Sequence, residues 1–258
     1  MCFGSNERDT ILILGKYKDK YLNWFMKAVE KTNDKAVVKD YFNQKGFDRW
    51  RRIYGETDDV NKVQKKIREG HQQTIDTVVG WLKADGNLDE LTICDAGCGV
   101  GSLSIPLARE GAVVSASDIS AKMVGEAKEK AEAVLENTSK VEFSVSDLEA
   151  LSGKYDTVIC LDVLIHYPTA DAAKMIAHLA SLAESRVILS FAPKTYVLSV
   201  LKKIGEFFPG PSKTTRAYQH KEADIIKILQ DNGFEIKRKD MTSVSFYYSK
   251  ILEAVRVS

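Results

Sequence analysis

Three glycines and an aspartate mark the part of the sequence best suited to chemistry. Gly97, Gly99 and Gly101 are spaced G-x-G-x-G in the run TICDAGCGVGS. Such a turn brings the backbone close to a nucleotide-bearing ligand. Asp95 lies two residues before the first glycine, and Ser102 stands where a dinucleotide fingerprint carries its third glycine or alanine. The turn therefore predicts an adenosine-bearing cofactor.

The charge of Asp95 discriminates between the candidate cofactors. A carboxylate at the end of the strand repels an incoming pyrophosphate and attracts an ammonium group. S-adenosylmethionine carries an ammonium and a sulfonium group and no phosphate. The residues therefore favour S-adenosylmethionine over NAD or FAD.

Two further aspartates extend this set. Asp118 follows Gly97 by 118 − 97 = 21 residues and ends a second strand pattern, a position from which a carboxylate binds ribose hydroxyls. Asp147 ends a third strand pattern, where we expect it to accept a hydrogen bond from the adenine amino group, with Leu148 beside the ring. The alternative is that these aspartates only cap the following helices. The predicted cofactor site also includes Cys98, Ile119, Met123 and Leu161.

The elements that position these residues alternate in type. From residue 91 onward, short runs rich in β-formers alternate with helical segments, which predicts a parallel sheet covered on both faces. The runs 234–244 and 246–256 predict an antiparallel pair at one edge of that sheet. Upstream, an apolar stripe from Val63 to Leu82 predicts one long helix ending near residue 86. His71 lies on that stripe, which favours a packed core histidine.

The amino-acid composition limits the classes of protein to which the chain can belong. The chain has 258 residues, of which 44% are hydrophobic and 28% charged, as in ordinary globular proteins. A net charge of +1 gives no reason to expect a nucleic-acid partner. Its four cysteines lack paired C-x-x-C spacing, which argues against structural zinc and for a reducing compartment. No apolar run approaches the roughly 20 residues of a membrane-spanning helix. We therefore expect a soluble or peripheral protein without a protein-bound metal.

Longer segments resemble the magnesium-protoporphyrin IX methyltransferase family, within the class I S-adenosylmethionine-dependent superfamily. CDAGCGVGSLSIPLA fits any member of that superfamily, whereas GFDRWRRIYG, LDVLIHYP and FPGPSKTTRAYQH are more specific. The resemblance runs from about residue 37 to residue 256. It implies an α/β fold with a doubly wound, Rossmann-like sheet of seven mostly parallel strands and an antiparallel C-terminal edge pair. The expected divisions are an N-terminal extension of unknown role (1–36), a helical lid (37–90) and a core (91–258) with a substrate-binding arm at about 194–220.

The resemblance also implies an activity and a setting. The methyl group of S-adenosylmethionine would pass to a propionate carboxylate of magnesium-protoporphyrin IX, forming the monomethyl ester in chlorophyll biosynthesis. Such enzymes are found in plastids, or in the cytoplasm of cyanobacteria. The resemblance leaves open contact with magnesium chelatase and peripheral association with the thylakoid or envelope membrane.

Four residues are candidates for the acceptor side of the reaction. His166 in LIHYP follows the fourth strand pattern and would orient the propionate, or accept its proton if the acid form binds. Tyr54 in RRIYG would fix the propionate or cofactor from the lid. Their alternatives are a histidine satisfied by the local turn and a tyrosine that anchors its helix. Lys213 and Arg216 would receive the second propionate or, alternatively, belong to a solvated loop.

Three other functions remain open at this stage. The first is a class I methyltransferase for another lipophilic molecule, such as a quinone precursor. A nicotinamide oxidoreductase is the second, and Asp95 and Ser102 count against it. The third is a catalytically silent, cofactor-binding partner of the chelatase.

Overall fold

The computed structural model describes residues 35–55, 60–194 and 217–257. Within them, a single sheet has seven strands in the order β3-β2-β1-β4-β5-β7-β6. Neighbouring strands are parallel except for β7, which is antiparallel to both β5 and β6. This arrangement confirms the predicted mostly parallel sheet with its antiparallel C-terminal pair. The strands are β1 (Thr92–Ala96), β2 (Val113–Asp118), β3 (Val141–Val145), β4 (Tyr155–Cys160), β5 (Ala183–Phe191), β6 (Phe234–Val244) and β7 (Tyr247–Arg256).

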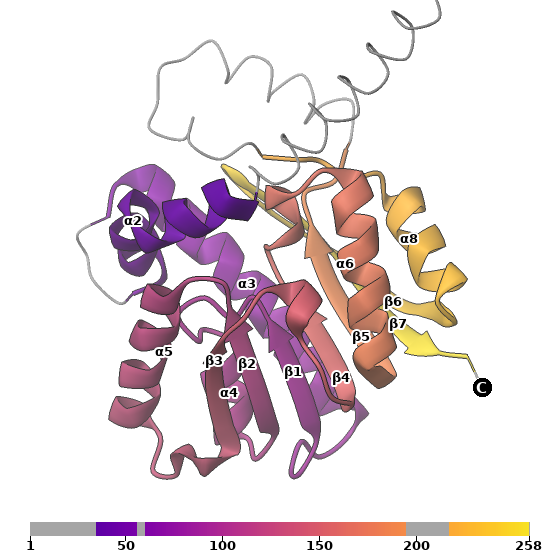
Figure 1. The fold of residues 1–258 in the computed structure, drawn as a ribbon, viewed down its shortest axis with the longest axis horizontal. Coiled ribbons are helices and arrows are strands. Elements are labelled where there is room, and N and C mark those ends of the chain that lie inside the picture. The colour runs from indigo at the N-terminus through magenta and orange to yellow at the C-terminus, as the bar shows by residue number, and fades with distance from the viewer. Residues whose placement is uncertain (1–34, 56–59, 195–216, 258) are drawn as a thin grey trace, which may run out of the picture.

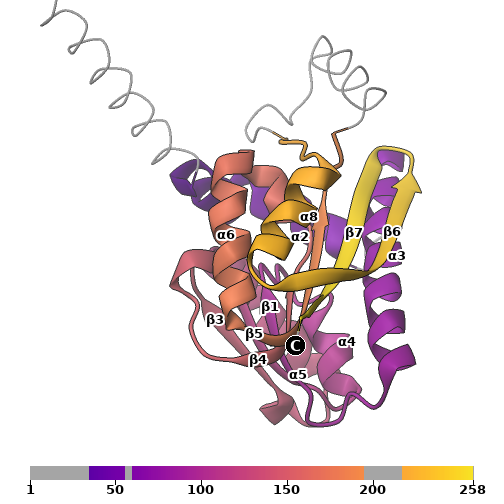
Figure 2. The ribbon, with the colours of Figure 1, turned by 90° about the vertical axis from the view of Figure 1, so that its right-hand side faces the viewer.

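Helices cover both faces of the sheet (Figure 1; Figure 2). Helices α3, α4 and α5 supply the buried residues of one face, and α6 and α8 supply those of the other. Residues 35–43 are helical as well. The named helices are α2 (Lys45–Tyr54), α3 (Lys62–Asp85), α4 (Ser104–Arg109), α5 (Ala121–Val134), α6 (Thr169–Leu182) and α8 (Glu222–Asp231). Three short 3₁₀ turns, η1 (Thr138–Lys140), η2 (Leu148–Ala150) and η3 (Leu164–His166), complete the described elements.

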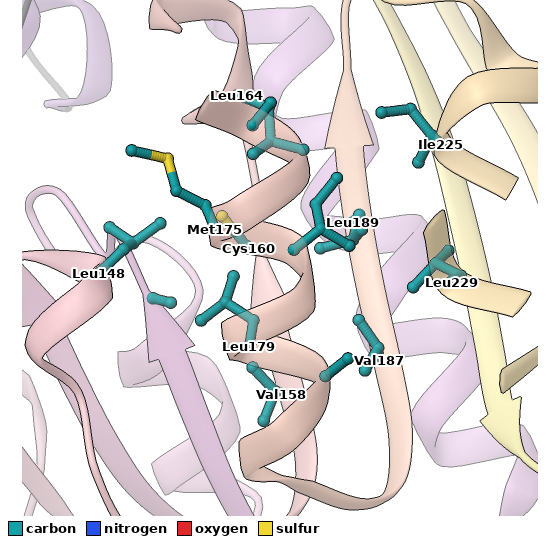
Figure 3. Packing of buried hydrophobic residues seen from close by; sticks show 14 of the residues in the cluster. Leu148, Val158, Cys160, Leu164, Met175, Leu179, Val187, Leu189, Ile225 and Leu229 are labelled. Carbon is teal, nitrogen blue, oxygen red and sulfur yellow. The ribbon is translucent and has the colours of Figure 1, made fainter. Parts of the chain in front are cut away.

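Two apolar clusters hold these layers together. Figure 3 shows Met175 and Leu179 of α6 packed over strands β4 and β5, with Leu229 of α8 beside them. On the opposite face, Ile75 and Leu82 of α3 are buried in the second cluster. Burial of one such aliphatic side chain contributes roughly 1.5 to 3 kcal/mol. The predicted apolar stripe of the long helix is thus the face that packs on the sheet.

Hydrogen bonds attach the N-terminal helices to the rest of the structure. The Asn43 carboxamide oxygen accepts a hydrogen bond of 2.9 Å from Ser120 Oγ at the start of α5. The Arg68 guanidinium of α3 donates to the carbonyl oxygens of Arg52 and Ile53 at the end of α2. The two bonds from Arg68 satisfy backbone carbonyls that a helix C-terminus leaves without intrahelical partners. Helix α2 is therefore held between α3 and α5, while its action as a lid stays a prediction.

Candidate active site

The carboxyl ends of the parallel strands open into a cavity of about 980 Å³. Its walls come from the glycine turn after β1, the segments after β2 and β4, the N-terminal helices and the β6–β7 hairpin. Ligand sites in such sheets lie at the carboxyl ends of the strands, where the chain order reverses. The volume is at the upper end of the roughly 300 to 1,000 Å³ usual for small-molecule sites. The cavity thus has room for a second molecule beside a nucleoside.

The glycine turn adopts a conformation that requires glycine. Gly97 and Gly99 have φ values of 92° and 54°, in the left-handed region. A Cβ atom on Gly97 would lie 2.1 Å from Val163 Cγ2, whereas one on Gly99 would meet no atom within 4 Å. Gly97 therefore allows the close approach of a neighbouring loop, and the open space at Gly99 leaves room for a ligand. Both residues line the cavity with Cys98, whereas Gly101 does not.

Asp118 ends β2 and lines the cavity. Its carboxylate accepts hydrogen bonds from the backbone amides of Gly99 (3.0 Å) and Ser120 (2.8 Å). Burial raises the pKa of Asp118, and these amide hydrogen bonds lower it in part. Each carboxylate oxygen has a second lone pair. The fixed orientation suits the ribose contact predicted for Asp118, and Ile119 and Met123 line the cavity beside it.

Asp95 lies beneath the turn rather than in the cavity wall. Its side chain is only 2% exposed and accepts a hydrogen bond from Ser104 Oγ. Burial raises the pKa of Asp95 to about 6, and the neighbouring negative charge of Asp118 adds to the increase. The carboxylate is therefore ionised at a cost in free energy, which a nearby cation would reduce. Its predicted contact with the cofactor's ammonium group stays a prediction.

Asp147 lies outside the large cavity. Its carboxylate forms an ion pair of 3.0 Å with Lys35 Nζ and caps η2 through the backbone amide of Glu149. It borders a small neighbouring hollow, while Leu148 and Leu161 line the large cavity. Its hydrogen bond to the adenine amino group stays a prediction, whereas the capping interaction is present in the structure.

The two predicted catalytic residues, His166 and Tyr54, both line the cavity. His166 ends η3, its ring lies 5.2 Å from that of Phe42, and its buried Nδ1 atom has no hydrogen-bonding partner among the described residues. Burial lowers the pKa of His166 to about 4, so that the imidazole is neutral near pH 7. Burial likewise raises the pKa of Tyr54, which keeps its phenol protonated. Both side chains can therefore donate hydrogen bonds to a carboxylate.

His71 does not have the packed core position that its apolar stripe favoured. It lines the cavity, and its Nδ1 atom lies 2.9 Å from Asp162 Oδ2. The ring of Tyr54 lies against it, with the ring centroids 4.2 Å apart. The prediction was wrong because the stripe turns from the sheet to the cavity along α3, and periodicity alone does not distinguish these surroundings.

Asp162 is a site residue that the sequence reasoning missed. It follows β4 with a φ of 58° and accepts hydrogen bonds from Tyr247 Oη (2.7 Å) and Ser190 Oγ (3.0 Å). A positive φ is uncommon for a residue other than glycine and often marks a functional position. The available signal was an aspartate after a strand pattern, the same signal that identified Asp118.

Among the described residues of the cavity wall, one arginine supplies the positive charge. Arg49 lines the cavity, and no other arginine or lysine does so in the part of the chain that the structure describes. The predicted Lys213 and Arg216 lie outside the described residues, as does most of the predicted arm at 194–220. Among described residues, no group of three or more His, Cys, Asp or Glu could hold a metal ion. The same residues include no helix long and apolar enough to cross a membrane.

The sheet order, the glycine turn and the aspartate after β2 define a class I S-adenosylmethionine-dependent methyltransferase. A general methyltransferase model matches residues 93–185, and a model described as "Magnesium-protoporphyrin IX methyltransferase C-terminus" matches residues 160–256. The second match includes η3, α6 and the C-terminal strands. It therefore concerns the half of the chain that carries His166 and Asp162.

Individual relatives cover most of the chain. A magnesium-protoporphyrin O-methyltransferase of Synechocystis sp. is 70% identical over 224 residues, covering 87% of this chain and 97% of the relative. A chloroplastic magnesium protoporphyrin IX methyltransferase of Arabidopsis thaliana is 61% identical, and the match covers 86% of this chain and 71% of the relative. A crystal structure of the Synechocystis enzyme with bound SAH superposes with a TM-score of 0.81 and 69% identity, covering 86% of this chain and all of the other. The chain belongs to the magnesium-protoporphyrin O-methyltransferase family.

Proposed function

We propose that the chain transfers the methyl group of S-adenosylmethionine to a propionate carboxylate of magnesium-protoporphyrin IX. The products are the monomethyl ester and S-adenosylhomocysteine, in a step of chlorophyll biosynthesis. The 70% identity to a magnesium-protoporphyrin O-methyltransferase over nearly its whole length carries this proposal. The cavity of about 980 Å³ beside the glycine turn supports it, because it has room for more than the methyl donor.

Methyl transfer to a carboxylate does not require the protein to remove a proton from the acceptor. A carboxyl group with an ordinary pKa of ~4 is already ionised at neutral pH. The acceleration must therefore come from aligning its oxygen with the methyl carbon and from removing water around it. We assign this alignment to His166 and Tyr54, since both line the cavity and near pH 7 the neutral imidazole keeps one N–H and the phenol keeps its O–H, each of which can donate a hydrogen bond to the carboxylate.

The cofactor half of the site uses the residues after β1 and β2. Asp118 would hold the ribose, and Asp95 would favour the cationic donor over phosphates. Leu148, Leu161 and Met123 would contact the adenosine and methionine parts from the cavity wall. Because methyl transfer converts a sulfonium into a neutral thioether, the attraction of Asp95 is stronger for the donor than for the product.

The substrate is a dianion before methylation, and its second carboxylate needs a partner. Arg49 lines the cavity, and its guanidinium can bind a carboxylate through two parallel hydrogen bonds. Lys213 and Arg216 of the predicted arm would add to this charge by binding the second propionate. Helix α2, which carries Arg49 and Tyr54, would act with them as a lid.

The setting follows from the relatives. One relative is named chloroplastic, and another comes from the cyanobacterium Synechocystis. We extend this to a location in the plastid stroma or the cyanobacterial cytoplasm, with peripheral contact to the thylakoid or envelope membrane and with magnesium chelatase. A pull-down with chelatase subunits and a flotation assay with thylakoid lipids would test the two contacts separately.

Incubation with S-adenosylmethionine and magnesium-protoporphyrin IX, followed by mass analysis, tests the proposed function. One added methyl group, located on a propionate by fragmentation, is the expected result. Parallel reactions with catechol-type quinone precursors test the alternative acceptor class. Methylation of those acceptors in preference to the porphyrin would overturn the proposal.

A further inference from the structure

One ring nitrogen of His71 is held by a carboxylate. Its Nδ1 atom lies 2.9 Å from Asp162 Oδ2, across 91 residues of sequence. An ionised carboxylate can only accept a hydrogen bond, so the proton of a neutral His71 resides on Nδ1. The Nε2 atom then carries a free lone pair. Among the described residues no hydrogen bond engages Nε2.

The carboxylate that orients His71 is itself fixed. Burial would raise the pKa of Asp162, but hydrogen bonds from His71, Tyr247 and Ser190 outweigh burial and lower it. The network continues from Tyr247 Oη to Thr74 Oγ1 on α3, 3.1 Å away. It therefore joins α3 to the ends of β4, β5 and β7 and leaves the His71 ring little freedom to turn.

The surroundings of His71 are otherwise apolar. Val63 and Ile67 precede it at intervals of four on α3, and all three line the cavity. Residues four apart lie on one face of a helix. The Tyr54 ring covers one side of the imidazole. This helix face thus presents a single basic nitrogen on an aliphatic and aromatic wall.

We propose, resting on the function proposed above, that His71 Nε2 is the axial ligand of the magnesium ion in the porphyrin substrate. Metal-binding histidines almost always donate their other ring N–H to a carboxylate or carbonyl, which fixes the tautomer and increases the basicity of the ligating nitrogen. A metalloporphyrin supplies four ligands from its own nitrogens. It needs only one more from the protein, in contrast to a free ion that needs a cluster of side chains.

His166 does not share this arrangement. Its Nδ1 atom is buried with no hydrogen-bonding partner in the described chain, so no carboxylate selects a tautomer for it. The two histidines therefore have separate roles, His71 toward the metal and His166 toward the propionate. A metal contact of this kind makes the enzyme select the metallated porphyrin over the metal-free one.

Binding of two porphyrins to the full chain, saturated with S-adenosylhomocysteine, tests the proposal. The probes are magnesium-protoporphyrin IX and metal-free protoporphyrin IX, titrated by fluorescence quenching. For the wild type we expect a preference of about tenfold or more for the magnesium form, the range in which metal-site changes act. His71→Ala removes the preference and leaves metal-free binding unchanged. Added imidazole restores the preference and the wild-type absorption spectrum of the bound magnesium porphyrin.

Two further variants separate ligation from a structural role. Asp162→Asn keeps the shape and tolerates a positive φ, but its amide N–H donates to Nδ1 and moves the proton to Nε2, as in other His–carboxylate pairs. We expect this variant to lose the preference as His71→Ala does, without rescue by imidazole. The matched control is Gln72→Ala, on the exposed side of the same helix turn. We expect this control variant to keep the preference for the magnesium porphyrin.

The outcomes distinguish this inference from the proposed function. If the wild type neither binds nor methylates magnesium-protoporphyrin IX, the proposed function fails, and this inference fails with it. If the wild type methylates it but His71→Ala retains the metal preference and the bound spectrum, only the axial ligand is refuted. If His71→Ala loses binding of metal-free protoporphyrin IX as well, His71 has a structural role, and its assignment as the axial ligand is refuted.

Discussion

Substitution of the buried carboxylate beneath the glycine turn gives the sharpest test of the site's electrostatics. Burial moves the pKa of Asp95 from 3.8 to about 6. The folded protein therefore binds a proton at Asp95 more tightly than the unfolded chain does. Its contribution to stability is fully present below pH ~4 and is lost as the pH rises through ~6. At 1.36 kcal/mol per pKa unit, the loss is about 3 kcal/mol in total.

Asp95→Asn removes this titration with little change in shape. Urea unfolding of the cofactor-free proteins at several pH values measures the difference in unfolding free energy between variant and wild type. From about pH 4.5 to about pH 7.5 we expect the difference to shift by about 2 kcal/mol in favour of the variant, the part of the total that falls in this window. Any constant effect of the new amide cancels in this comparison. Calorimetry should show weaker binding of S-adenosylmethionine to the variant at pH ~7.5.

A flat difference between the two proteins over this pH range would refute the assignment of a raised pKa. Unchanged affinity for S-adenosylmethionine would refute the attraction between Asp95 and the cofactor's cation. The two measurements are independent, because the first uses protein without cofactor.

Four other substitutions have defined outcomes. Asp118→Ala should weaken cofactor binding by calorimetry about tenfold or more, because a buried charge-assisted hydrogen bond contributes about 1.5 to 3 kcal/mol; unchanged binding would remove its ribose role. His166→Ala and Tyr54→Phe should lower kcat with little effect on cofactor affinity, and full activity in both would refute the pair. Gly70→Ala should destabilise the fold by about 1 to 3 kcal/mol in thermal unfolding, because its Cβ would lie 2.3 Å from the Tyr247 ring; an unchanged Tm would show that the ring moves freely.

The local pattern predicted those parts of the site that each depend on one short segment. The glycine turn, Asp118 at the end of β2 and Leu148 after β3 were found because strand, turn and helix signals adjoin them in the chain. The segments GFDRWRRIYG and LDVLIHYP, which contain Tyr54 and His166, indicated the family. The same local logic placed Asp147 at the cofactor, whereas the structure pairs its carboxylate with Lys35, 112 residues away.

The sequence by itself determined the mostly parallel sheet, the glycine turn and the apolar face of α3, because each depends on the period of a short stretch of chain. Only the tertiary structure decided that β7 lies between β5 and β6, and that His71 meets Asp162. Helical periodicity fixes the direction in which a side chain points but not what it meets. That depends on how α3 crosses the end of the sheet, where packing gives way to the cavity.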